Sequence, residues 1–124
     1  MNEAYILDLF KQQDHYLPFL ELHGDIGSAE NVTCGDEIKF QVLLDKEAKV
    51  ITSIRYTGNS CSITLASAEY LAKTFEKKEV PIDEGQVTQQ LLAVFELDVS
   101  HQRKTCATLS VKAFFSALKG YQKT

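Results

Sequence analysis

The residues of this chain best suited to chemistry are its three cysteines, Cys34, Cys61 and Cys106. Three cysteines cannot all form pairs, and the features described below indicate a cytoplasmic protein, in which structural disulfides are rare. The cysteines are also too far apart in sequence for a zinc finger or ribbon, which is built on paired C-x-x-C knuckles. Because thiolates bind metals and attack sulfur, we expect any site that they share to be assembled by the fold.

Each cysteine is predicted to lie at a structural boundary. Cys34 lies in a turn with Gly35 and Asp36, Cys61 lies directly before a helix, and Cys106 lies in the first turn of the last helix. The positive end of a helix dipole favours a thiolate, and Gly35 permits a sharp turn that points the Asp36 carboxylate to the side of the Cys34 thiol. Taken singly, each cysteine has an ordinary alternative as a small buried apolar residue, and Asp36 as a turn or cap residue.

Hydrophobic periodicity predicts one helix, two strands and then three helices. Alternating apolar residues between Ile38 and Tyr56 indicate a hairpin, whereas the turn formers between Pro18 and Val32 indicate a loop or at most a short strand. The predicted helices span residues 2–13, 62–77, 84–97 and 105–118, the predicted strands span 38–44 and 50–56, and the predicted caps are Asn2, Asp83 and Gly120. Strands followed by helices without alternation favour an α+β domain with an antiparallel sheet covered by helices.

The composition excludes several classes of protein. A length of 124 residues with 44% hydrophobic residues fits a single domain, residues 1–124. No stretch reaches the roughly 20 apolar residues of a membrane span, and the N-terminus lacks the basic flank of a signal peptide, so we expect a cytoplasmic protein without a membrane partner. The net charge of −4, with lysines and arginines scattered among acidic residues, argues against nucleic acid as a partner.

Three sequence windows together resemble the cysteine motifs of the U-type iron-sulfur assembly scaffolds. The windows are Thr33-Cys34-Gly35-Asp36, then Gly58-Asn59-Ser60-Cys61-Ser62-Ile63-Thr64 leading to Ala66-Ser67-Ala68, and finally Arg103-Lys104-Thr105-Cys106-Ala107-Thr108-Leu109. This family includes SufU, IscU and the N-terminal domain of NifU. The resemblance implies an antiparallel three-stranded sheet packed against helices, with the three cysteines and Asp36 at one exposed end. It also implies a first strand before Cys34, where the residues by themselves predict a loop or at most a short strand.

The residues divide between two branches of that family. Arg103 and the Cys106-Ala107-Thr108-Leu109 segment resemble the SufU branch. The IscU branch carries a histidine directly before the third cysteine, where this chain has Thr105, and a chaperone-docking Leu-Pro-Pro-Val-Lys motif that is absent here. The segment between Cys61 and Cys106 is nevertheless too short for the insertion typical of SufU, and Val32 stands where a proline is usual. The chain is therefore similar to SufU in its ligand motifs and to IscU in its length.

The resemblance implies a metal site made by Cys34, Asp36, Cys61 and Cys106. Three thiolates and one carboxylate suit tetrahedral Zn²⁺, which is the first expectation. Iron, or a [2Fe-2S] cluster on the three cysteines, is the alternative, and a carboxylate in place of a fourth thiolate is expected to ease its release.

Two uses of such a site follow from the resemblance. In the SufU type, Cys34 accepts persulfide sulfur from a cysteine desulfurase of the SufS or IscS kind, and the protein is a zinc-bound sulfurtransferase. Arg103 is close enough in sequence to Cys106 to support the thiolates, and its alternative is a solvated arginine at the helix entry. In the IscU type, sulfur arrives on Cys106 and a cluster is built before transfer to apo iron-sulfur proteins.

Other interpretations carry less weight. His101 can bind zinc, but it reads as a surface residue in a polar loop, and His15 and His23 carry still less weight as ligands. Glu76, together with Glu79 and Glu84, reads as part of a solvated helix end. A cysteine hydrolase lacks its local nucleophile motifs in this chain, and a structural zinc domain that only binds partners stays open.

Overall fold

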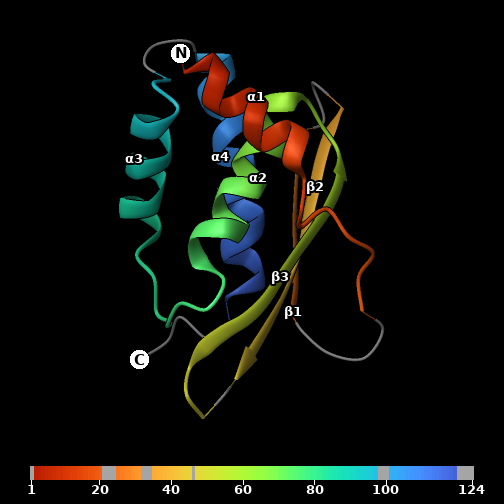
Figure 1. Cartoon of the computed structure of the whole chain (residues 1–124), viewed down its shortest axis with the longest axis vertical. Helices are drawn as coiled ribbons and strands as arrows, with labels where there is room; N and C mark the ends of the chain where they lie inside the picture. The colour runs from red at the N-terminus through yellow and green to blue at the C-terminus, as the bar shows by residue number, and fades with distance from the viewer. Residues whose placement is uncertain (1, 21–24, 32–34, 46, 98–100, 120–124) are drawn as a thin grey trace.

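The computed structural model describes residues 2–20, 25–31, 35–45, 47–97 and 101–119, with only the backbone described for residues 101–103. In chain order the elements are α1 (Glu3–Gln12), β1 (Asp25–Asn31), β2 (Asp36–Asp45), β3 (Val50–Asn59), α2 (Ser62–Phe75), α3 (Glu84–Val94) and α4 (His101–Ala117). The three strands form an antiparallel sheet, and the helices lie to one side of it (Figure 1). The predicted α+β class with a three-stranded antiparallel sheet is confirmed.

The sheet has the order β1-β2-β3, so each strand pairs with its neighbour in sequence. The first strand, which the family resemblance implied, is present at Asp25–Asn31, where the residues alone predicted a loop or at most a short strand. Its signal is weak because the buried position of β1 is Gly27, which contributes no apolar side chain. A Cβ atom at Gly27 would lie 2.2 Å from the backbone nitrogen of Ala117, so glycine here lets α4 pack directly on the strand.

The helices agree with their predicted positions except at some ends. Asn2 caps α1 by accepting a hydrogen bond from the backbone N–H of Tyr5, and Asp83 caps α3 by accepting one from Gln86, both as predicted. The predicted C-cap Gly120 lies outside the described residues. The last helix begins at His101 instead of Thr105, because the polar residues before Cys106 include good helix formers and no breaker.

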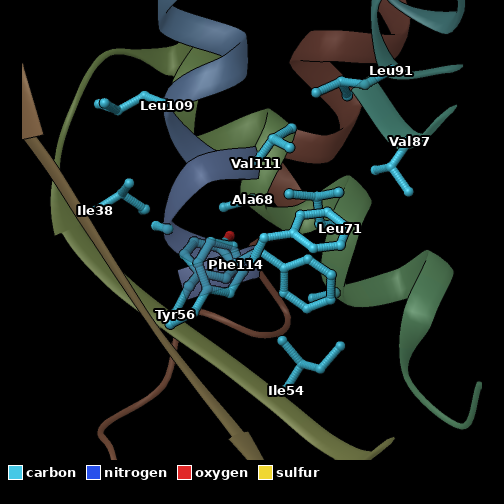
Figure 2. Close-up of a cluster of buried hydrophobic side chains, with 14 of the residues drawn as sticks. Ile38, Ile54, Tyr56, Ala68, Leu71, Val87, Leu91, Leu109, Val111 and Phe114 are labelled. Atoms are coloured by element: carbon cyan, nitrogen blue, oxygen red, sulfur yellow. The ribbon is translucent and has the colours of Figure 1, made fainter. Parts of the chain in front are cut away.

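The core lies between the sheet and helices α2 and α4. Alternate residues of β2 and β3, such as Phe40 and Tyr56, are fully buried against these helices. Phe114 of α4 lies at the centre of this cluster, with its ring centroid 5.5 Å from that of Phe40 (Figure 2). This packing fixes α2 and α4 relative to the sheet, and both helices carry a predicted ligand.

The segment after α1 also contacts the sheet. His15 accepts a backbone hydrogen bond from Tyr56 of β3, and Leu20 exchanges two hydrogen bonds with the buried side chain of Gln41. These bonds hold the described part of the segment after α1, up to Leu20, against β2 and β3, and they bring His15 to the edge of α2.

Candidate metal centre

Three of the predicted ligands converge at one end of the sheet. One carboxylate oxygen of Asp36 and the Sγ atoms of Cys61 and Cys106 all lie within 4.8 Å of one another. Cys61 is exposed, whereas Asp36 and Cys106 are partly buried. We call these three residues the ligand cluster. They come from a strand, a helix N-terminus and a second helix, so no local motif could have assembled them.

The hairpin of β2 and β3 brings Asp36 beside Cys61. Asp36 is the first residue of β2, and the neighbouring Glu37 pairs with Asn59, the last residue of β3. The hydroxyl of Ser60 donates a hydrogen bond of 2.7 Å to the carbonyl of Glu37, which fastens the chain at the exit of β3. Cys61 follows at once, so the register of the hairpin sets the separation of these two ligands.

The turn before β2 has the conformation expected of its glycine. Gly35 has a φ of +72°, in the region that other residues adopt only with strain, and it has open space on its side-chain side. It places Asp36 at the start of the strand. Cys34, the predicted sulfur acceptor, lies outside the described residues, as do the side chains of Arg103 and His101, so their predicted roles stay predictions.

The two cysteines of the ligand cluster lie in different positions relative to their helices. Cys61 is the N-cap of α2 and its carbonyl accepts the first helical bond, from Leu65. Cys106 is not in the first turn of α4 as predicted, because that helix begins at His101, five residues earlier in the sequence. Of these two cysteines, only Cys61 therefore lies at the N-terminal end of its helix.

Two buried hydroxyl residues that the sequence did not single out lie between the helices that carry these cysteines. Thr64 follows Cys61 by three positions and Ser110 follows Cys106 by four, and both side chains are buried. Residues three and four apart share a helix face, so this spacing is a signal that could have been used.

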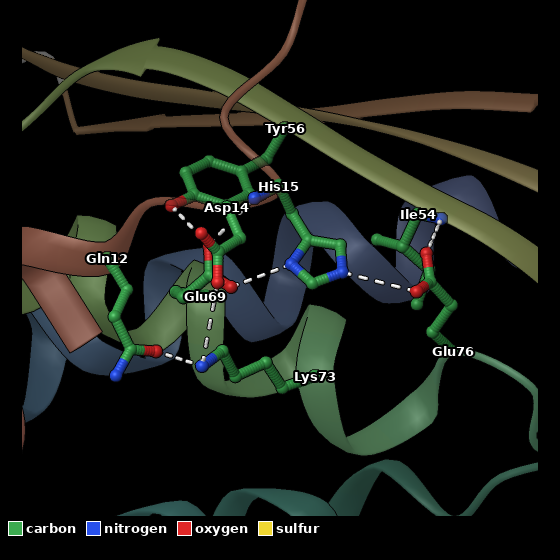
Figure 3. Close-up of polar contacts among 8 residues, drawn as sticks. All are labelled: Gln12, Asp14, His15, Ile54, Tyr56, Glu69, Lys73 and Glu76. Atoms are coloured by element: carbon green, nitrogen blue, oxygen red, sulfur yellow. Dashed lines mark hydrogen bonds and ion pairs between the residues drawn. The ribbon is translucent and has the colours of Figure 1, made fainter.

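A second polar cluster lies along the C-terminal half of α2 (Figure 3). It consists of His15, Tyr56, Glu69 and Glu76, and we call it the His15 cluster. The imidazole Nδ1 of His15 lies 2.6 Å from Glu69 Oε2, and its Nε2 lies 3.2 Å from Glu76 Oε1. The backbone N–H of His15 and the hydroxyl of Tyr56 each donate a 3.0 Å bond to Glu69 Oε1. Glu69 is fully buried. It accepts hydrogen bonds from His15 in the segment after α1 and from Tyr56 of β3.

This environment controls the charge of His15. Burial opposes the imidazolium, but the hydrogen bonds and negative charges of Glu69 and Glu76 outweigh it and raise the pKa of His15 above its ordinary value. Burial, followed by the charge of Glu69, also raises the pKa of Tyr56, which keeps its phenol protonated as a donor.

The prediction that Glu76 belongs to a solvated helix end is wrong. Its carboxylate contacts His15 and also accepts a 3.1 Å hydrogen bond from the backbone N–H of Ile54. Glu76 lies directly after α2, where the chain passes the middle of β3, and this proximity depends on tertiary packing. Glu79 and Glu84 are exposed, as predicted.

The ligand cluster has the donor chemistry of a site for zinc or iron. Two thiols and a carboxylate offer soft sulfur with one oxygen, a set that Zn²⁺ and iron accept and that Mg²⁺ and Ca²⁺, which prefer oxygen alone, do not. When deprotonated, three negative groups within 4.8 Å repel one another, and a bound cation relieves that repulsion. The residues present therefore fit the metal that the sequence predicted, without choosing between zinc and iron.

Comparison with known proteins gives a consistent family. The family model described as "NifU-like N terminal domain" matches residues 1–124. The chain is 27% identical over 120 residues to "Iron sulfur cluster assembly protein 1, mitochondrial" of Debaryomyces hansenii. That match covers 90% of this chain and 66% of the relative. It is 24% identical over 89 residues to "Iron sulfur cluster assembly protein 2, mitochondrial" of Saccharomyces cerevisiae, covering 72% of this chain and 56% of that one. The chain thus spans less than two thirds of the length of these relatives.

Solved structures share the fold. A SufU of Fervidobacterium islandicum, described as an assembly scaffold for the SUF system, superposes with a TM-score of 0.75 at 21% identity, covering 92% of this chain and 93% of that one. A NifU-like N-terminal domain of Brucella abortus superposes with a TM-score of 0.67 at 12% identity, covering 93% and 90% of the two chains.

Among the described residues, no helix is both long enough and apolar enough to cross a membrane.

Proposed function

This chain belongs to the NifU-like N-terminal domain family, and we propose that it is an iron-sulfur cluster assembly protein whose site comprises Cys34, Asp36, Cys61 and Cys106. The observation that carries the proposal is the convergence of one carboxylate and two thiols within 4.8 Å from three separate elements. Cys34 supplies the fourth ligand, since it directly precedes the Gly35 turn that leads into Asp36.

Within this function we propose a zinc-bound sulfur acceptor. Zn²⁺ supplies a positive charge that keeps the thiols deprotonated. The Cys34 thiolate attacks the outer sulfur of a persulfide on a cysteine desulfurase. A new S–S bond forms on Cys34 as the old one breaks, and the desulfurase cysteine leaves as a thiolate, so the exchange needs no added oxidant or reductant. Arg103, three residues before Cys106, is proposed to favour the thiolates by its charge.

The scaffold role is the second candidate. The segment between Cys61 and Cys106 holds α2 and α3 and has no room for the insertion typical of the SufU branch. In this role the cluster is cargo, held by Cys34, Cys61 and Cys106 and passed to apo iron-sulfur proteins. The carboxylate of Asp36 favours release, because a hard oxygen ligand holds iron-sulfur species less firmly than thiolate does.

One experiment separates the two roles. The protein is purified without oxygen, and its zinc, iron and acid-labile sulfide are measured together with its visible spectrum. The sulfur acceptor is expected to carry about one zinc per chain and to raise the turnover of a SufS-type desulfurase. Iron and sulfide in a brown protein that does not stimulate the desulfurase would overturn the acceptor role in favour of the scaffold.

Cys34→Ser distinguishes both roles from a purely structural zinc domain. As a transfer or assembly residue, Cys34 is expected to be dispensable for folding, so the variant keeps its far-UV spectrum and loses sulfur acceptance. Loss of the folded spectrum would instead indicate a structural metal site. A protein that keeps its sulfur acceptance after chelation and complete metal removal would contradict the metal-held site altogether.

The cytoplasmic location stays a prediction from the sequence, beside relatives whose names carry the word mitochondrial.

A further inference from the structure

One buried hydroxyl contacts both cysteine residues of the ligand cluster. Thr64 lies in the first turn of α2, and its side chain is fully buried. Its Oγ1 lies 3.3 Å from the Sγ atom of Cys61 and donates a 3.0 Å hydrogen bond to the backbone carbonyl of Cys106. The residues that it joins are 45 positions apart in sequence (61 and 106) but share the same proposed ion.

A second hydrogen bond fixes the same two helices. The hydroxyl of Ser110 donates a 2.7 Å bond to the carbonyl of Thr64, and Ser110 lies one helical turn after Cys106. Thr64 is therefore joined to α4 through its hydroxyl at one turn and through its carbonyl at the next. Two bonds at different heights restrict both the separation of α2 from α4 and the rotation of one about the other, and these quantities determine how closely Cys61 approaches Cys106.

The bonds made by Thr64 and Ser110 differ from those of three other helical hydroxyls among the described residues. Ser67, Thr88 and Thr108 each donate to the carbonyl four residues earlier in their own helix. Such local bonds are the usual way in which a helical serine or threonine satisfies its proton. Thr64 instead donates across to the other cysteine-bearing helix, so its hydroxyl links two elements and serves the geometry between them.

We propose that Thr64 is a positioning residue for the ligand cluster, holding Cys61 and Cys106 so that both sulfur atoms can bind one ion. The proposal rests on the metal site put forward above, but not on whether that site transfers sulfur or builds a cluster. A hydroxyl has one proton and two lone pairs. While Thr64 donates to the Cys106 carbonyl, its oxygen accepts from the Cys61 thiol. The bond to the Cys106 carbonyl uses the single proton of the hydroxyl, so this link between the two helices does not depend on a proton at Cys61.

The test is titration of the metal-free full-length chain with Co²⁺, which reports tetrahedral thiolate ligation by its visible absorption. Thr64→Val keeps the branched shape and removes the hydroxyl, and its Co²⁺ affinity is expected to fall about 10-fold or more, as for other partners that orient metal ligands. Thr64→Ser restores the hydroxyl and is expected to bind within about 3-fold of the wild type. Thr64→Ala is titrated in parallel, so that a folding failure of the valine variant does not remove the test.

Two controls separate positioning from general stability. Ser110→Ala removes the companion bond between the same helices and leaves the hydroxyl beside the Cys61 sulfur, so a smaller loss of Co²⁺ affinity is expected than for Thr64→Val at a similar loss of urea stability. Thr88→Val removes a local hydroxyl bond on α3 and is expected to bind Co²⁺ like the wild type.

Three results would overturn the inference. Equal affinity of Thr64→Val and the wild type would show that the hydroxyl does not position the thiols. Equal losses in Thr64→Val and Ser110→Ala would reduce Thr64 to a packing role, and so would a failure of Thr64→Ser to restore binding. A wild-type chain that does not bind Co²⁺ through thiolates would overturn the proposed metal site itself, and the inference with it.

Discussion

The ligand cluster and the His15 cluster lie at opposite ends of α2. Both contain carboxylates that need positive charge or hydrogen-bond donors nearby, and the two clusters meet this need differently. In the His15 cluster, the buried carboxylate of Glu69 meets an imidazole, a phenol and a backbone N–H, so the protein itself supplies the compensating donors. In the ligand cluster, a carboxylate and two thiols converge within 4.8 Å at a partly exposed position, and their repulsion favours a cation from solution.

This difference indicates that the two ends of α2 have separate roles, with structural stability at one end and ion binding at the other. Polar groups that are saturated by the protein fix a structure, because removing any one partner leaves another buried and unpaired. Ligands that need an external ion can change their state, because the ion can be exchanged. The predictions below test whether stability and metal binding separate in this way.

The largest effect is expected from Glu69→Ala. The substitution leaves His15 and the Tyr56 hydroxyl without their common buried partner, and breaking a buried charged pair typically costs about 3 to 5 kcal/mol. Urea unfolding of the metal-free protein measures this loss, with the exposed Glu79→Ala as the matched control, expected within about 0.5 kcal/mol of the wild type. If Glu69→Ala unfolds like the control, the His15 cluster does not stabilise the fold.

Cys61→Ser is expected to give the opposite pattern. Cys61 is exposed, so the metal-free variant should unfold within about 0.5 kcal/mol of the wild type. Its Zn²⁺ affinity should fall by more than the roughly 100-fold that loss of an outer partner can cost, because a direct ligand is lost. Competition with a zinc chelator measures this change. A variant that is destabilised without losing zinc would reverse the division proposed between the two clusters.

The two clusters also differ in how far the sequence reveals them. Asp36, Cys61 and Cys106 stand in local motifs that mark them singly, and the hairpin register and the helix order then bring them together. His15 carries no such mark, because its partners Glu69 and Glu76 lie 54 and 61 residues later in the chain. Glu76 carries none for the same reason. A polar residue beside a lysine pair looks solvated until the packing of α2 on β3 is known.

The fold shows the same limit at β1 and α4. β1 was not recognisable from its residues, because its single buried position is Gly27 and burial there comes from the backbone of α4. The start of α4 was misplaced because the polar residues before Cys106 lack the apolar periodicity on which the prediction relied. Apolar alternation in β2 and β3 reports burial directly, so the hairpin was predicted correctly.

His15→Gln is expected to lower the free energy of unfolding by an intermediate amount that depends on pH. Because the pKa of His15 is raised in the folded state, its ion pairs with Glu69 and Glu76 stabilise the fold fully below the unfolded pKa of about 6.5. That contribution is lost as the pH rises through the folded pKa. The difference in unfolding free energy between wild type and variant should therefore be largest in mild acid and shrink in base. Urea titrations at several pH values measure it, and a difference that grows with pH would contradict the charged imidazole.

The last expected effect is that of Gly35→Ala, which has a modest cost in stability and bears on the ligand cluster alone. Gly35 has a φ of +72° and open space around it, so a methyl group meets no atom but strains the backbone, at a cost of about 1 kcal/mol. The turn can relieve that strain by rotating Asp36 away from Cys61, and zinc affinity should then fall while the His15 cluster is untouched. Zinc competition and urea unfolding on the same variant measure both quantities, with Gly85→Ala in the first turn of α3 as the control. Unchanged zinc affinity at the expected stability loss would show that the Asp36 ligand does not depend on the conformation of this turn.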